Sequence, residues 1–115
     1  MRVTLYHNPR CSKSRQTLQL LEDNGVTPTV IEYLKTPPSI EELNSLLTLL
    51  NLQPRELMRT KEAEYTEKQL DNVNLTRDEL IAAMVATPKL IERPIAVTDD
   101  KAVIGRPPEN VLTLL

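Results

Sequence analysis

The N-terminal third of the chain carries a strand–helix–strand pattern, and this pattern restricts the fold more than any other feature of the sequence. Residues 2–6 alternate apolar and polar side chains before the Asn8-Pro9 turn, and residues 29–33 are rich in β-branched side chains. Between them, the spacing of apolar residues predicts a helix that begins around Cys11 and ends before Gly25. Two strands connected in this way are expected to be parallel, with a right-handed crossover.

The middle of the chain reads as helical and begins after the break at Thr36-Pro37-Pro38. Two capping boxes, Ser39 with Glu42 and Thr76 with Glu79, mark helix starts. Pro54 predicts a further short helix, and residues 62–70 a weaker one. The first of these helices carries an apolar stripe that consists of Ile40, Leu43, Leu46, Leu47 and Leu50.

The C-terminal part predicts a hairpin and a last helix. Residues 95–98 and 102–105 are apolar runs separated by Asp99-Asp100, which favours an antiparallel pair. Pro107-Pro108 then starts a last helix with Val111, Leu112 and Leu115. The predicted class is therefore α/β: a thioredoxin-like three-layer fold with a small mixed sheet and an all-helical insertion at about residues 36–92. The 115 residues are expected to form one domain, 1–115.

Composition limits the core and the possible partners. The apolar share is 40% without any Phe or Trp, so the core must be mainly aliphatic. A net charge of −2 without basic runs argues against nucleic acid or an anionic membrane as a partner. A single cysteine excludes an internal disulfide and a Cys-rich zinc site, and no metal is expected. Without an apparent signal peptide or membrane span, we expect a cytoplasmic monomer in a reducing compartment.

Cys11 lies where the first strand turns into the first helix, and this position favours a reactive thiol. Unpaired backbone N–H groups and the helix dipole stabilise a thiolate there, and Arg10, Lys13 and Arg15 add positive potential. The pKa of the thiol should lie below the reference value of about 8.5. The same N–H groups would hold an oxyanion beside the sulfur. The alternative, a small buried hydrophobic cysteine, fits these polar neighbours poorly.

Two polar residues flank the cysteine. Ser14 stands where a dithiol motif would have its second cysteine, so it offers a hydroxyl to the thiolate but cannot form a disulfide. His7, the only histidine, either tunes the thiolate or is a strand-end residue bonded to the backbone, and the sequence does not decide between these roles.

Three arginines follow at positions that suit an anion site. Arg59 comes after the short helix, Arg93 precedes Pro94 at the start of a strand, and Arg106 follows the partner strand. Guanidinium groups offer paired, permanently charged donors to tetrahedral oxyanions. The loop before the third strand of a thioredoxin-like sheet lies beside the cysteine and commonly holds a cis-proline, for which Pro94 is the candidate.

Together, these motifs resemble the glutaredoxin-dependent arsenate reductase family. The resemblance covers nearly the whole chain, from Val3 to Leu112, and rests on the following motifs: Tyr6-His7-Asn8-Pro9-x-Cys11-x-x-Ser14-Arg15, Pro37-Pro38-Ser39, Arg59, Arg93-Pro94-Ile95 and Arg106-Pro107. It implies an oxidoreductase in which Cys11 is the nucleophile. It also implies that Arg59, Arg93 and Arg106 bind arsenate and its product, and that His7 and Ser14 tune the thiolate.

The implied reaction needs thiols from outside the chain. The Cys11 thiolate would attack arsenate and form a Cys–S–As adduct, glutathione would attack the adduct, and glutaredoxin would regenerate the thiol as arsenite leaves. Glutathione is thus a co-substrate, glutaredoxin a partner, and no bound cofactor is expected.

Other functions remain possible. One alternative is a redox-sensing transcription regulator of related fold that binds RNA polymerase, although such proteins typically use a Cys-x-x-Cys switch that Ser14 removes here. Another is a monothiol glutathione-dependent thiol transferase, which has no need of three arginines. A low-molecular-weight phosphatase is disfavoured because residues 11–15 lack the Cys-x5-Arg loop.

Overall fold

The computed structural model describes residues 2–115 and divides into two compact units. The first unit contains the chain up to Thr36 together with Arg93–Leu115. The second unit is Pro37–Glu92, which lies in the sequence where the helical insertion is predicted. Within residues 2–115, no helix has the length and apolar character that crossing a membrane requires.

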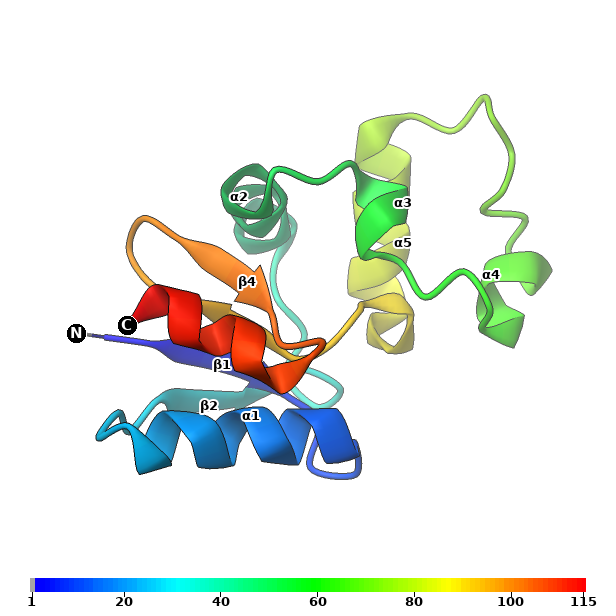
Figure 1. Ribbon diagram of the computed structural model, residues 1–115. Helices are drawn as coiled ribbons and strands as arrows, with labels where there is room; N and C mark the ends of the chain where they lie inside the picture. The colour runs from blue at the N-terminus through cyan, green and yellow to red at the C-terminus, as the bar shows by residue number, and fades with distance from the viewer. Residues whose placement is uncertain (1) are drawn as a thin grey trace. The chain divides into compact units, whose positions relative to one another are not determined.

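The first unit is built on a four-stranded mixed sheet with the order β2-β1-β3-β4 (Figure 1). The strands are β1 (Thr4–His7), β2 (Thr29–Glu32), β3 (Ile95–Val97) and β4 (Ala102–Ile104). β1 pairs in parallel with β2 and antiparallel with β3, which pairs antiparallel with β4. This confirms the predicted α/β class, with a parallel pair and a hairpin in one sheet. The structure places the first strand over Thr4–His7, slightly later than the expected residues 2–6.

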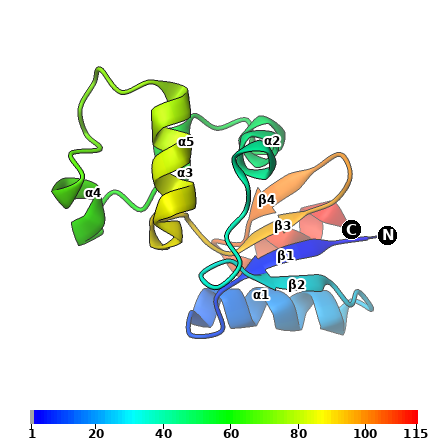
Figure 2. The same cartoon turned by 180° about the vertical axis from the view of Figure 1, so that it is seen from behind.

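Two helices supply the apolar cover of this sheet. α1 (Ser12–Asp23) and η2 (Pro108–Leu114) lie side by side in Figure 1, and Figure 2 shows the four strands from behind. Alternating strand residues and the inner faces of both helices form one apolar cluster, whose buried members are Val3, Leu5, Leu21, Ala96, Val111 and Leu114. The packing of α1 on β1 fixes the strand-to-helix turn that carries Cys11.

The last helix is present where it was predicted, and its type decides which residues it buries. η2 is a 3-10 helix, in which residues three apart eclipse one another. Pro108, Val111 and Leu114 are therefore the buried residues. Leu112 and Leu115, also apolar, are 40% and 46% exposed.

The second unit is helical. Its elements are α2 (Ile40–Leu50), α3 (Pro54–Leu57), α4 (Ala63–Glu67), α5 (Arg77–Ala86) and η1 (Pro88–Leu90). Both predicted capping boxes are present, with reciprocal hydrogen bonds at Ser39 and at Thr76. Ile40 is 51% exposed rather than buried, because side chains tilt towards the helix N-terminus and the first residue projects past the packed turn.

The core is mainly aliphatic, as its composition requires, but it also takes in every aromatic side chain. Tyr6, Tyr33 and Tyr65 are 6%, 1% and 9% exposed. Tyr6 and Tyr33 belong to the first unit, whereas Tyr65 belongs to the second.

Candidate active site around Cys11

The loop between β1 and α1 is held by hydrogen bonds that converge on Asn8. The N–H of Cys11 donates to the Asn8 carbonyl oxygen at 3.0 Å, and the N–H of Arg10 donates to Asn8 Oδ1 at 3.0 Å. Arg15 Nη1 donates to the carbonyl oxygen of Pro9 at 3.0 Å. The sequence indicated a turn at Asn8-Pro9, but it did not indicate that the Asn8 side chain accepts this hydrogen bond.

Cys11 occupies the N-cap position of α1, with extended backbone, and its side chain is half-buried. The first N–H groups of the helix therefore lie near the sulfur, and those of Lys13 and Ser14 help to lower its pKa. The Cys11 side chain makes no capping hydrogen bond of ordinary geometry, so these N–H groups act on it through weaker contacts.

Ser14 connects His7 to the loop. Its side chain is fully buried, and its Oγ accepts the N–H of Asn8 at 3.0 Å and lies 2.8 Å from His7 Nδ1. Burial lowers the pKa of His7, Arg15 lowers it further, and Glu32 partly opposes them. The net downward shift favours neutral imidazole near pH 7, so His7 brings little positive charge to the loop.

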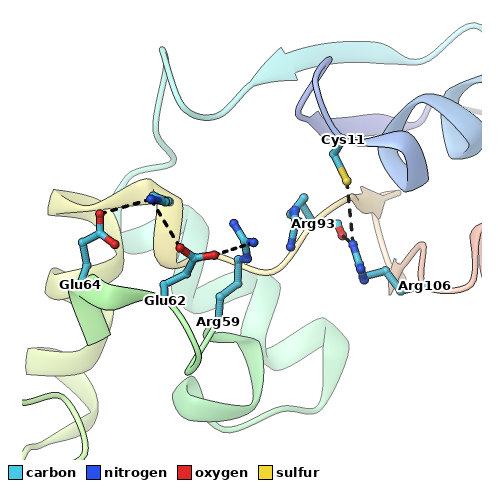
Figure 3. Close-up of polar contacts among 7 residues, drawn as sticks. Cys11, Arg59, Glu62, Glu64, Arg93 and Arg106 are labelled. Atoms are coloured by element: carbon cyan, nitrogen blue, oxygen red, sulfur yellow. Dashed lines mark hydrogen bonds and ion pairs between the residues drawn. The ribbon is translucent and has the colours of Figure 1, made fainter. Parts of the chain in front are cut away.

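Two of the three predicted arginines adjoin the sulfur. Arg106 Nη1 lies 3.9 Å from Cys11 Sγ and also donates to the carbonyl oxygen of Arg93 at 3.3 Å (Figure 3). The Arg93–Pro94 peptide bond is cis, in agreement with the expectation for Pro94. The Arg106–Pro107 bond is also cis, which the sequence did not indicate.

These neighbours shift the pKa of Cys11 downward. Burial raises the pKa, but the N–H of Ser14, the charge of Arg93, the N–H of Lys13 and the charge of Arg106 together outweigh it. Both guanidiniums favour the thiolate, Arg106 from a contact of 3.9 Å and Arg93 as a half-buried charge.

Arg106 is placed by a close contact between α1 and the end of β4. Gly105 donates its N–H to the Pro94 carbonyl oxygen at 2.9 Å, and Thr17 Oγ1 lies 3.5 Å from the Gly105 carbonyl oxygen. A Cβ at Gly105 would lie 2.5 Å from Thr17 Oγ1 and 2.9 Å from Pro94 Cγ. Only glycine fits at this position, directly before Arg106.

The third predicted arginine belongs to the second unit. Arg59 donates its N–H to the Leu90 carbonyl oxygen at 2.7 Å, and its guanidinium pairs with Glu62 at 2.6 Å. The first unit therefore gathers Cys11, His7, Ser14, Arg93 and Arg106, whereas Arg59 is held within Pro37–Glu92. Over residues 2–115, the structure contains no group of three or more His, Cys, Asp or Glu side chains that could hold a metal ion.

Chemically, this arrangement suits attack on an electrophile that carries negative oxygens. The lowered pKa increases the thiolate fraction of Cys11 near neutral pH. Arg93 and Arg106 supply guanidinium charge beside the sulfur, where it would offset charge on the oxygens of a bound oxyanion.

Comparison with known proteins gives one consistent family. The ArsC family matches residues 6–114. An arsenate reductase of Haemophilus influenzae is 48% identical over 116 residues and covers 100% of both chains. The uncharacterized protein YfgD of Escherichia coli K12 is 54% identical, covering 98% of this chain and 96% of its own length. The solved arsenate reductase from Vibrio cholerae superposes with a TM-score of 0.97 at 54% identity, covering 100% of this chain and 98% of that one.

Proposed function

The chain belongs to the ArsC family, and from this premise we propose that it is an oxidoreductase that reduces arsenate to arsenite. Similar proteins from Haemophilus influenzae and Vibrio cholerae are named arsenate reductases, which supports this substrate. The thioredoxin-like α/β fold of these proteins, with its mixed sheet, is also the fold of this chain.

The observation that carries the proposal is the surroundings of Cys11. Its sulfur lies at the N-terminus of α1, 3.9 Å from Arg106 Nη1, with Arg93 and the first helical N–H groups lowering its pKa. A thiol transferase needs the lowered pKa alone. Guanidinium groups beside the thiolate favour a substrate with charged oxygens.

In the proposed reaction, the Cys11 thiolate attacks arsenic, a sulfur–arsenic bond forms, and one hydroxyl of arsenate takes up a proton and leaves as water. Arg93 and Arg106 offset the charge on the remaining oxygens. Cys11 is the only cysteine, so the two electrons must come from two external thiols, which end as one disulfide while As(V) becomes As(III). Water then hydrolyses the sulfur–arsenic(III) bond, which releases arsenite and returns Cys11 to the thiol form.

Several finer points are part of this proposal. We propose glutathione as the reducing thiol and glutaredoxin as the partner that regenerates Cys11, with no bound cofactor. Arg59 is proposed as a third arsenate-binding guanidinium on the strength of the family resemblance, with His7 and Ser14 as residues that tune the thiolate. A cytoplasmic, monomeric protein is the form in which we expect this chemistry.

The test is turnover of arsenate by the purified protein with glutathione and glutaredoxin. Wild type should produce arsenite, and Cys11→Ser should produce none because the nucleophile is lost. Arg93→Ala should lose more activity than thermal stability. The absence of turnover by wild type, or full turnover by Cys11→Ser, would refute the proposal. Disulfide reduction measured in parallel distinguishes a general thiol transferase.

A further inference from the structure

The guanidinium of Arg59 is tied to a carboxylate within its own unit. Arg59 Nη2 lies 2.6 Å from Glu62 Oε1, whereas Lys89 Nζ lies 3.5 Å from the nearest oxygens of Glu62 and Glu64 (Figure 3). Both side chains are mostly shielded, with 23% and 21% of their surface exposed. A short, shielded, charge-assisted contact restricts the rotamers of a long side chain more than an exposed pair does.

A second contact holds the carboxylate in turn. Lys89 Nζ lies 3.5 Å from Glu62 Oε2 and 3.5 Å from Glu64 Oε2. A backbone hydrogen bond also connects the segments that carry Arg59 and Lys89. The N–H of Arg59 donates to the carbonyl oxygen of Leu90, the residue after Lys89, at 2.7 Å. Arg59 is therefore fixed at both its backbone and its guanidinium by groups that are themselves connected.

The arrangement leaves donors of Arg59 available. A guanidinium has five N–H donors, and Glu62 contacts Nη2. Within residues 2–115, Nε and Nη1 of Arg59 make no hydrogen bond or ion pair. Lys89 offsets part of the negative charge that Glu62 brings to the guanidinium. Such a group is oriented and still able to receive an anion.

We propose that Glu62 and Lys89 are positioning residues that orient Arg59 for the oxyanion substrate; this inference rests on the proposed function. Glu62 orients the guanidinium by direct contact, and Lys89 acts indirectly because it contacts the Glu62 carboxylate. The fixed rotamer means that Arg59 loses less conformational freedom when arsenate binds, so the pair lowers KM rather than raising kcat.

Steady-state arsenate reduction by Glu62→Gln tests this assignment. KM for arsenate should rise about threefold to tenfold, the size expected when a direct neighbour of one group is removed, while kcat stays within about twofold. Lys89→Met should raise KM less than Glu62→Gln does. Glu67→Gln is the matched control, because Glu67 is exposed in α4 and makes no ion pair within the described residues.

A double-mutant comparison separates positioning from general stability. If Glu62 acts through Arg59, Glu62→Gln should have no further effect on KM in an Arg59→Ala background. An unchanged or lower KM in Glu62→Gln alone would overturn the proposal, since a lower KM would mean that the carboxylate merely competes with the substrate. An equal rise in both backgrounds would also overturn it.

An NMR measurement tests the arrangement without turnover. A guanidinium held at Nη2 should give a resolved Nη–Hη signal for Arg59 at low temperature, assigned by its loss in Arg59→Ala, and Glu62→Gln should broaden or remove it. If wild type fails to reduce arsenate, the proposed function fails while this signal still reports on the ion pair. A missing signal in wild type would overturn the inference.

Discussion

Gly105 offers a sharp test of how the fold places Arg106. A Cβ at this position would lie 2.5 Å from Thr17 Oγ1, 2.9 Å from Pro94 Cγ and 3.1 Å from Thr17 Cγ2. Thr17 is fully buried and its Oγ1 donates to the Lys13 carbonyl oxygen at 2.8 Å, so it cannot turn away without losing this bond. Gly105→Ala should therefore force α1 and the end of β4 apart.

The expected cost is that of overpacking a buried contact, about 2 kcal/mol of unfolding free energy. For a chain of this length the unfolding entropy converts that to a fall in Tm of about 8 °C. Thermal unfolding followed by circular dichroism measures it. Because Arg106 follows Gly105 directly, the same variant should also raise the pKa of Cys11, which the pH dependence of iodoacetamide alkylation reports.

Measuring Gly105→Ala in a Thr17→Ala background tests whether Thr17 causes the loss of stability. In Thr17→Ala, both threonine atoms that meet the new Cβ are absent, so adding Gly105→Ala should cost clearly less than in wild type. Gly25→Ala is the control: Gly25 has φ +78° with nothing within 4 Å, so its cost is conformational and should be the same in both backgrounds. A Tm unchanged by Gly105→Ala, or an equal cost in both backgrounds, would refute the reasoning.

Two further predictions concern pH and helix capping. Burial lowers the pKa of His7 below 6.5, so near this pH the unfolded chain binds more protons than the folded chain, and stability should fall as pH drops from about 6.5 through the folded pKa. His7→Gln should reduce this pH dependence of the unfolding free energy, measured by denaturant unfolding. An unchanged pH slope would contradict the assignment. Ser39→Ala removes the acceptor of the Glu42 N–H at the start of α2 and should lower the unfolding free energy by about 1 kcal/mol. The pH at which Cys11 is half-alkylated should stay the same. A changed alkylation profile would show that the cap affects more than its own helix.

The sequence predicted the parts of the fold that have local causes. The capping boxes at Ser39 and Thr76 rely on residues three apart, and the parallel pair of β1 and β2 follows from strand–helix–strand spacing. The last helix was harder, because Pro107-Pro108 predicts a helix start but not whether the period is three or 3.6. Its buried face depends on packing against α1.

For the candidate site, the sequence predicted the residue types better than their connections. The placement of Cys11 at the start of α1 and the presence of Arg93 and Arg106 beside it follow from the strand order. The hydrogen bonds centred on Asn8, and the contact between Thr17 and Gly105, join residues whose neighbours only the folded chain defines. The Glu62 pairing of Arg59 is an i, i+3 contact that the spacing could have suggested.

The distribution of tyrosines has a practical consequence for studying folding. The chain has no tryptophan, so intrinsic fluorescence comes from Tyr6, Tyr33 and Tyr65 alone. Tyr65 is the one that lies between Pro37 and Glu92. Replacing the other two with phenylalanine would leave a single native fluorophore, whose emission follows the opening of the helical segment separately from that of the sheet.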